Sequence, residues 1–177
     1  AESEGVVPDV LLTGKSLSGG VVPVAAALAT AELYEPLARD PLLHTSTFGG
    51  APLAAAAARA AIETIEREQL VARSRSLGDR VLAHLGLLAA AHPSVVREVR
   101  GAGLLIGVEL TSPAAAGELL LQLLDRRILV NSPFNDERSL RLTPPAVMTE
   151  SELDRLLGGL SEGIATVARL DEHGGAA

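Results

Sequence analysis

The chain has 177 residues, of which 47% are hydrophobic, so it is long and apolar enough to form a packed core. Its formal net charge of -7 argues against a nucleic-acid partner, which would select a basic face. It contains no cysteine, which excludes disulfides, cysteine-ligated zinc and a cysteine nucleophile.

The first part of the chain predicts two short strands, then a short helix and a long one. The strands are expected at 10–12, an apolar run, and at 21–28, where Pro23 makes the strand irregular or places it at an edge. A short helix is expected over 32–38. From 52 to 67 apolar residues recur at i, i+4, i+7 and i+8, which predicts an amphipathic helix.

The rest of the chain predicts helices and strands in alternation. A helix is expected over 70–91, ended by Pro93, with an apolar stripe made of Leu77, Val81, Leu85 and Leu88. The other expected elements are strands at 95–99, 104–110, 128–130 and 139–142, a turn at 101–103, a helix at 114–126, and a last helix from 150 to about 168. Thr149 and Glu152 fit a capping box at the start of the last helix.

These elements divide the chain into two parts. Residues 68–177 predict a compact α+β domain. The first 50 residues contain strands but too few helices to bury a sheet of their own. We therefore expect residues 1–67 to belong to a larger domain, and the chain to be a piece of a longer polypeptide. The tail from Asp171 is expected to fray.

No metal site and no membrane span are expected. The four histidines lack metal-ligand spacing, such as i, i+4. The apolar stretch at 51–61 is too short to cross a membrane and is interrupted by Arg59. A reducing cytoplasmic location is the default for a chain without cysteine.

The segment LLTGKSLSGGVVP contains Lys15, the only lysine of the chain. A nucleotide-binding P-loop needs a glycine five residues before Gly14, where this chain has Asp9, and a helix directly after the lysine, where Gly19 and Gly20 intervene. A lysine fixed on a glycine-rich loop at a strand end can instead form an imine with a carbonyl compound. A solvated loop lysine is the alternative that the segment alone leaves open.

Four stretches, in order, carry a resemblance to one enzyme family. They are PDVLLTGKSLSGGVVP, HTSTFGGAPLAAAAA, VREVRGAGLLIGVEL and LRLTPPAVMTESELD. Over about residues 8 to 168 the chain is similar to the class III, or ornithine-type, aminotransferases. The resemblance implies an α/β fold, the fold type I of enzymes that depend on pyridoxal phosphate. Residues 1–67 would then be the C-terminal part of the cofactor-binding large domain with its connecting helix, and residues 68–177 the small domain.

The resemblance also implies roles for individual residues. Lys15 would form the imine with pyridoxal 5'-phosphate and then move a proton between substrate and cofactor. Thr47 would hydrogen-bond the cofactor phosphate across a subunit boundary, assisted by Ser46, and Arg141 would bind the substrate carboxylate. These residue types suit such ligands, since hydroxyls and amides ahead of a helix bind anions and a guanidinium pairs with a carboxylate. An N-cap cluster and an exposed strand arginine are the local alternatives.

Two positions beside Thr47 depart from the family pattern, with Thr45 in place of a glycine and Ala51 in place of an asparagine. In the family, three further parts of the cofactor site come from sequence that would precede Ala1. They are a phosphate-binding loop, an aromatic residue that stacks on the cofactor and an aspartate that pairs with its pyridine nitrogen. The fragment is therefore expected to bind the cofactor weakly or to be inactive alone.

The function that follows from the resemblance is transamination. A small-molecule amino donor would pass its amino group to a keto acid or aldehyde acceptor, in a homodimer with the site at the subunit interface. Aminomutase, racemase and decarboxylation-linked reactions share the same imine chemistry and stay open. An alternative of another class is a non-catalytic remnant or partner subunit, which would keep the domain without the chemistry.

Overall fold

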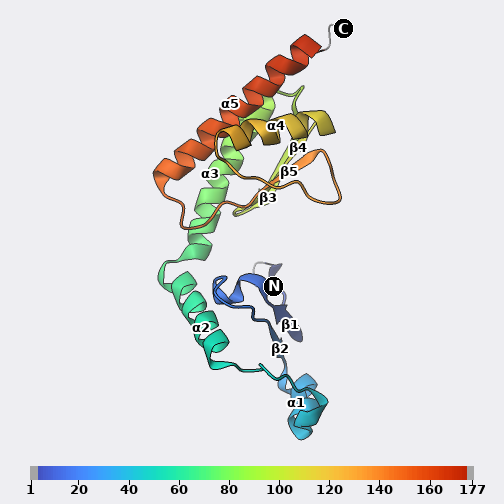
Figure 1. Ribbon diagram of the computed structural model, residues 1–177, viewed down its shortest axis with the longest axis vertical. Coiled ribbons are helices and arrows are strands. Elements are labelled where there is room, and N and C mark those ends of the chain that lie inside the picture. The colour runs from blue at the N-terminus through green and yellow to red at the C-terminus, as the bar shows by residue number, and fades with distance from the viewer. Residues whose placement is uncertain (1–3, 175–177) are drawn as a thin grey trace. The chain divides into compact units, whose positions relative to one another are not determined.

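The computed structural model describes residues 4–174 (Figure 1). The chain divides into two compact units between Glu68 and Gln69. The first unit holds the predicted lysine loop, and the second holds the predicted carboxylate-binding arginine.

The first unit is built on a two-stranded antiparallel hairpin, in which Val10 pairs with Ala29 and Thr13 with Ala26. Its elements are the strands β1 (Val10–Thr13) and β2 (Ala26–Ala29), the helices α1 (Ala31–Arg39) and α2 (Pro52–Arg67), and short 3-10 turns at Lys15–Ser18 and Pro41–Leu43. The turn after β1 packs against α2. Proline stands at the first turn of α2, where its missing N–H costs nothing.

The first unit has almost no interior of its own. Within residues 4–68, Ser18 is the only buried residue, at 1% exposure. Apolar strand residues stay open, with Leu12 75% exposed and Leu28 53% exposed. The expectation that this segment cannot bury its own sheet is therefore confirmed.

The second unit is a three-stranded antiparallel sheet, in the order β3-β4-β5, packed against three helices (Figure 1). Its elements are α3 (Leu70–Ala91), β3 (Val96–Ala102), β4 (Leu105–Leu110), α4 (Pro113–Asp125), β5 (Ser139–Leu142) and α5 (Glu150–Gly174). Alternation along β4 sends Ile106, Val108 and Leu110 into the core and leaves Glu109 on the opposite face. The predicted stripe of α3 is confirmed, because Leu77, Val81 and Leu85 are buried and Leu88 packs against the same core.

Three sequence-based expectations need correction. Residues 128–130 do not form a strand, because the N–H of Ile128 donates to the carbonyl of Leu123 at the end of α4 (2.9 Å). Only Asn131 bridges to β5, opposite Arg141. The second strand begins at Ala26, beyond Pro23, which has no N–H to donate. The last helix continues to Gly174, so the residues from Asp171 to Gly174 are helical; 175–177 lie outside the described residues.

The predicted capping box of α5 is confirmed and has a consequence for acid stability. The carboxylate of Glu152 accepts hydrogen bonds from the N–H and the hydroxyl of Thr149, at 2.7 and 2.8 Å. The backbone hydrogen bond, and then the side-chain one, lower the pKa of Glu152 below its ordinary value. A carboxyl whose folded pKa is depressed stabilises the fold above its unfolded pKa, and this contribution disappears as the pH falls through the folded pKa.

We therefore expect the free energy of unfolding to fall below about pH 4.3, the ordinary pKa of glutamate in the unfolded chain. Glu152→Gln should flatten this fall, because glutamine can still cap but does not titrate. Urea unfolding midpoints measured between neutral and acidic pH check the prediction. An unchanged pH slope in the variant would show that Glu152 does not contribute to it.

Candidate active site

The loop after β1 places Lys15 in a tightly defined backbone. Lys15 itself has a left-handed conformation (φ 51°), which is uncommon for a residue with a side chain. Gly19 closes the turn with φ 66°, and its N–H donates to the carbonyl of Ser16 at 2.9 Å. A methyl group on Gly19 would lie 3.7 Å from the Cβ of Ala61, so the loop and α2 approach closely here.

Ser18 fixes the rest of this loop, a role that the sequence did not reveal. Its buried hydroxyl donates to the carbonyl of Val22 at 2.5 Å and accepts from the N–H of Val22 at 3.3 Å. The only signal in the sequence is a small polar residue before two glycines. The loop is thus held from the inside, and the side chain of Lys15 is exposed without a hydrogen bond or ion pair to any residue from 4 to 174.

Ser46 and Thr47 lie in the turn that precedes α2. The turn is closed by hydrogen bonds from the N–H of Gly49 to the carbonyl of Ser46 and from the N–H of Ala51 to the carbonyl of Phe48, both 3.1 Å. Ala51 is the N-cap of α2 and has no side chain that could cap the helix. Both hydroxyl residues are exposed. Ser46 and Thr47 therefore do not cap the first amides of α2. This argues against the alternative in which the two residues form only an N-cap cluster.

Lys15 and Thr47 belong to different loops of the first unit. The lysine loop meets α2 at Ala61, nine residues or about 14 Å along the helix from Pro52. Thr47 lies beyond the opposite end, before Pro52. The structure thus gives two separate candidate binding elements in this unit.

Arg141 lies in the second unit, in the middle of β5. Leu140 and Leu142 are buried on the core side, which places Arg141 on the open face of the sheet, as the alternation predicts. Its backbone is held on both sides, by Gly107 of β4 and by Asn131, whose carbonyl accepts from the N–H of Arg141 at 2.6 Å. Its guanidinium makes no hydrogen bond or ion pair with the described part of the chain.

An open pocket of about 460 Å³ surrounds Arg141 on this face. Arg100, Gly107, Asn135, Asp136 and Ser139 are among the residues that line it. A free guanidinium in a pocket with further polar groups is suited to a carboxylate.

Asp136 organises the loop that borders this pocket. Its carboxylate accepts from the hydroxyl of Ser139 at 2.6 Å and from the N–H of Arg138 at 3.0 Å. The bond from Ser139, followed by the bond from Arg138, lowers the pKa of Asp136 below its ordinary value. The charged aspartate therefore fixes the chain directly before β5. The sequence did not single out Asp136, although Asp followed two residues later by an N–H donor is a common turn pattern.

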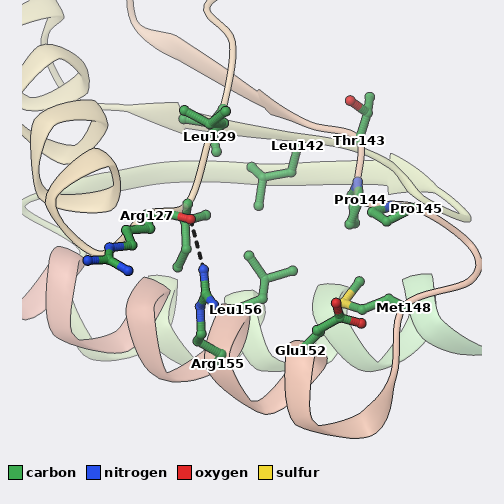
Figure 2. Close-up of a pocket in the computed structure, with 12 residues that line it drawn as sticks. Arg127, Leu129, Leu142, Thr143, Pro144, Pro145, Met148, Glu152, Arg155 and Leu156 are labelled. Carbon is green, nitrogen blue, oxygen red and sulfur yellow. Dashed lines mark hydrogen bonds between the residues drawn. The ribbon is translucent and has the colours of Figure 1, made fainter.

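A second cavity of about 270 Å³ lies between the segment after α4 and the start of α5 (Figure 2). Its walls are largely apolar, with Leu129, Leu142 and Leu156 facing it. Arg155 donates to the carbonyl of Arg127 at 2.9 Å, shown as the dashed line in Figure 2. This guanidinium therefore stabilises the fold by connecting α5 to the segment after α4. None of the four sequence-predicted site residues lines this cavity.

Residues 4–174 offer neither a metal site nor a membrane-spanning helix. Their acidic and histidine side chains form no cluster that could hold a metal ion. Within the same residues, none of the helices has the length and apolar character needed to cross a membrane.

Comparison with known proteins identifies the family. The chain matches the model of the family "Aminotransferase class-III" over residues 1–164. It therefore belongs to the class III aminotransferases, as the four sequence stretches predicted.

Solved structures of this family match both the fold and the sequence. Ornithine aminotransferase from Toxoplasma gondii aligns with 95% of this chain at 34% identity and a TM-score of 0.87. Acetylornithine aminotransferase from Elizabethkingia anophelis aligns with 93% at 34% identity and a TM-score of 0.85. Ornithine delta-aminotransferase from Plasmodium falciparum aligns with 95% at 33% identity and a TM-score of 0.83. The predicted α/β fold is confirmed.

The chain spans only part of these proteins. It covers 39% of the Toxoplasma enzyme, 43% of the Elizabethkingia enzyme and 42% of the Plasmodium enzyme. In another structure of the Toxoplasma enzyme, 33% identical to this chain, pyridoxal phosphate partially occupies the active site.

Proposed function

We propose that this chain carries the cofactor-binding lysine and the carboxylate-binding domain of a pyridoxal-phosphate-dependent aminotransferase. The enzyme moves an amino group from an amino acid or amine to a keto acid or aldehyde. One observation carries the proposal: the single lysine of a class III aminotransferase chain stands free on a loop that buried Ser18 holds in place.

The donor groups of this chain fit pyridoxal phosphate. Lys15 offers an exposed primary amine, which is the group that reacts with an aldehyde. Ser46 and Thr47 offer exposed hydroxyls before α2, whose first amides lack a side-chain cap, and such a helix start suits a phosphate. The amine of Lys15 therefore suits the aldehyde of the cofactor, and the hydroxyls of Ser46 and Thr47 suit its phosphate.

Each proposed residue has a defined task. The bound cofactor supplies an electron sink for the bond that is broken at the substrate Cα. Lys15 would hold the cofactor and, once released from it, would move a proton from the substrate Cα to C4' of the cofactor. Thr47, with Ser46 beside it, hydrogen-bonds the phosphate. Arg141 binds the substrate carboxylate through its guanidinium.

The proposal includes a homodimer, located in the cytoplasm. Membership of the class III family supports the dimer, because Thr47 matches the threonine that in this family serves the cofactor site of the neighbouring subunit. The matched Toxoplasma and Elizabethkingia proteins are named for ornithine and acetylornithine, so an amino acid with a free carboxylate is the class of donor that we propose.

Reductive trapping tests the role of the lysine directly. The chain is incubated with pyridoxal phosphate, reduced with borohydride and digested, and the modified peptide is identified by mass spectrometry. Because Lys15 is the only lysine, the α-amino group of the terminus is the sole competing primary amine. We expect the adduct on the peptide that contains Lys15, together with a visible absorption band before reduction.

The opposite results are equally clear. An adduct confined to the terminal amine, or no adduct on the Lys15 peptide in the full assembly that binds the cofactor, would contradict the proposed role of Lys15. The same reaction on the Ser18→Ala variant measures how far the buried hydroxyl prepares the loop. A slower or weaker modification of Lys15 is expected there, because Val22 loses its hydrogen-bond partner.

A further inference from the structure

The open face of the β3-β4-β5 sheet carries a cluster of charges centred on one carboxylate. Glu109 of β4, whose side chain is only 12% exposed, has three arginines around it. The distances are 3.2 Å to Arg97, 3.0 Å to Arg100 and 3.8 Å to Arg138. One carboxylate thus contacts three cations and offsets one of their charges. Arg97 and Arg100 lie on β3, and Arg138 directly precedes β5.

The neighbouring strand adds a second carboxylate that is much less involved. Glu98 of β3 stands directly opposite Glu109 in the register, and its side chain is 55% exposed. Two like charges in this position repel each other unless cations intervene. Arg100 provides that cation, since its Nη1 lies 3.0 Å from Glu109 and 3.4 Å from Glu98. Glu98 has this one arginine as its ion-pair partner within residues 4–174.

The register brings this cluster next to Arg141. Gly107 pairs with Arg141, and Glu109 pairs with Ser139, so Glu109 and Arg141 are diagonal neighbours at about 7–8 Å. Between them Gly107 has no side chain, and the stem of Arg100 lies over it, with Cγ 3.7 Å from where a Cβ would stand. Arg100 and Arg141 both line the open pocket.

We propose that Glu109 sets the anion selectivity of the Arg141 pocket by neutralising the arginines beside it. With Glu109 present, the pocket attracts a singly charged carboxylate without becoming a general site for doubly charged anions. The inference rests on the proposed function, in which Arg141 binds a substrate carboxylate. Glu109 acts through its neighbours and is a positioning residue.

The expected size follows from the distance. Removing one negative charge at about 7–8 Å, at a dielectric between that of a protein surface and that of water, should tighten binding by about fivefold for each charge on the ligand. A singly charged anion therefore gains about fivefold and a doubly charged one about 25-fold. The ratio of the two affinities is the quantity that identifies the effect.

The experiment titrates the ¹⁵N-labelled chain and its Glu109→Gln variant with acetate and with sulfate, at low and constant ionic strength. The Nε–H signal of Arg141 and the amide of Gly107 report binding. We expect Glu109→Gln to raise the preference for sulfate over acetate by about fivefold. Glu98→Gln is the matched control, because it removes the same charge from the same face one strand further away, and by the same dependence on distance it should change this preference by only about threefold.

Two further variants keep the test decisive. Arg141→Gln should abolish binding of both anions in either background. If Glu109→Gln loses the amide spectrum of the fold, Arg138→Gln tests the inference with the opposite sign, because removing a cation should lower the preference for sulfate. An unchanged preference, an equal gain for both anions, or no binding by any variant would overturn the inference. None of these measurements uses pyridoxal phosphate, so the outcome is separate from the trapping at Lys15.

Discussion

Replacing Lys15 with alanine is expected to abolish covalent incorporation of pyridoxal phosphate and to lower the rate of amino transfer by at least about 10²–10⁴-fold, the range that positioned acid–base groups supply. The lost side chain would be both the attachment point and the group that moves the proton. No other lysine can substitute for it. The measurement is the absorption of the holoprotein together with single-turnover formation of the keto product from an amino donor, in the full assembly that binds the cofactor.

The structure makes this variant easy to interpret. The Lys15 side chain has no partner within residues 4–174, so its removal should change the free energy of unfolding by no more than about 0.5 kcal/mol. Lys15→Arg is the matched control, because it keeps the positive charge but has no amine that can react with an aldehyde. Normal transfer by Lys15→Arg would show that Lys15 acts only as a charge.

Helices could be predicted well from this sequence, because their ends are marked by local chemistry. Pro52 and Arg67 bound α2 as expected, since proline is favoured at a helix start. Leu70 and Ala91 bound α3, with Pro93 two residues beyond its end. The face of α2 was harder to predict. The predicted apolar face of α2 is only half-buried and is made mainly of alanines, whereas Leu53 is 67% exposed.

The strand predicted at 128–130 was wrong because contacts between distant residues decide the structure there. The sequence at 128–130 is apolar and contains the β-branched Ile128 and Val130, which is typical of a strand. These two side chains pack against the core, but the backbone forms no strand. The backbone turns away after Arg127, which has φ 58°. No local pattern reveals that the end of α4 takes the N–H of Ile128.

In the candidate site, too, some residues are marked by local sequence and others depend on contacts between distant residues. Lys15 and Arg141 stand in short motifs, so the sequence was sufficient to name them as candidates. The cluster around Glu109 depends on which strands are neighbours and in what register, because its arginines are 9 to 29 positions away along the chain. The hydroxyl of Ser18 matters only because the loop folds over it. Such contacts follow from tertiary structure and have no signature in a single sequence.

The second large effect is expected at Gly78, in the buried face of α3. A Cβ added there would lie 2.1 Å from the carbonyl oxygen of Gly103 and 2.7 Å from its Cα. Both are backbone atoms in the turn between β3 and β4, where Gly103 already has φ 55°. The turn has no flexible side chain that could give way, so α3 must move off the sheet. We expect Gly78→Ala to lower the free energy of unfolding by on the order of 3 kcal/mol.

Gly86 gives the matched control within the same helix. A Cβ at Gly86 meets no atom within 4 Å, and the residue is exposed. Gly86→Ala should therefore raise the free energy of unfolding by up to about 1 kcal/mol, the helix propensity that alanine has over glycine. Because both variants share this gain, the difference between them in urea unfolding isolates the contact with Gly103. Equal stabilities would mean that α3 and the turn between β3 and β4 are not in contact, and that the three helices pack on this sheet in another way.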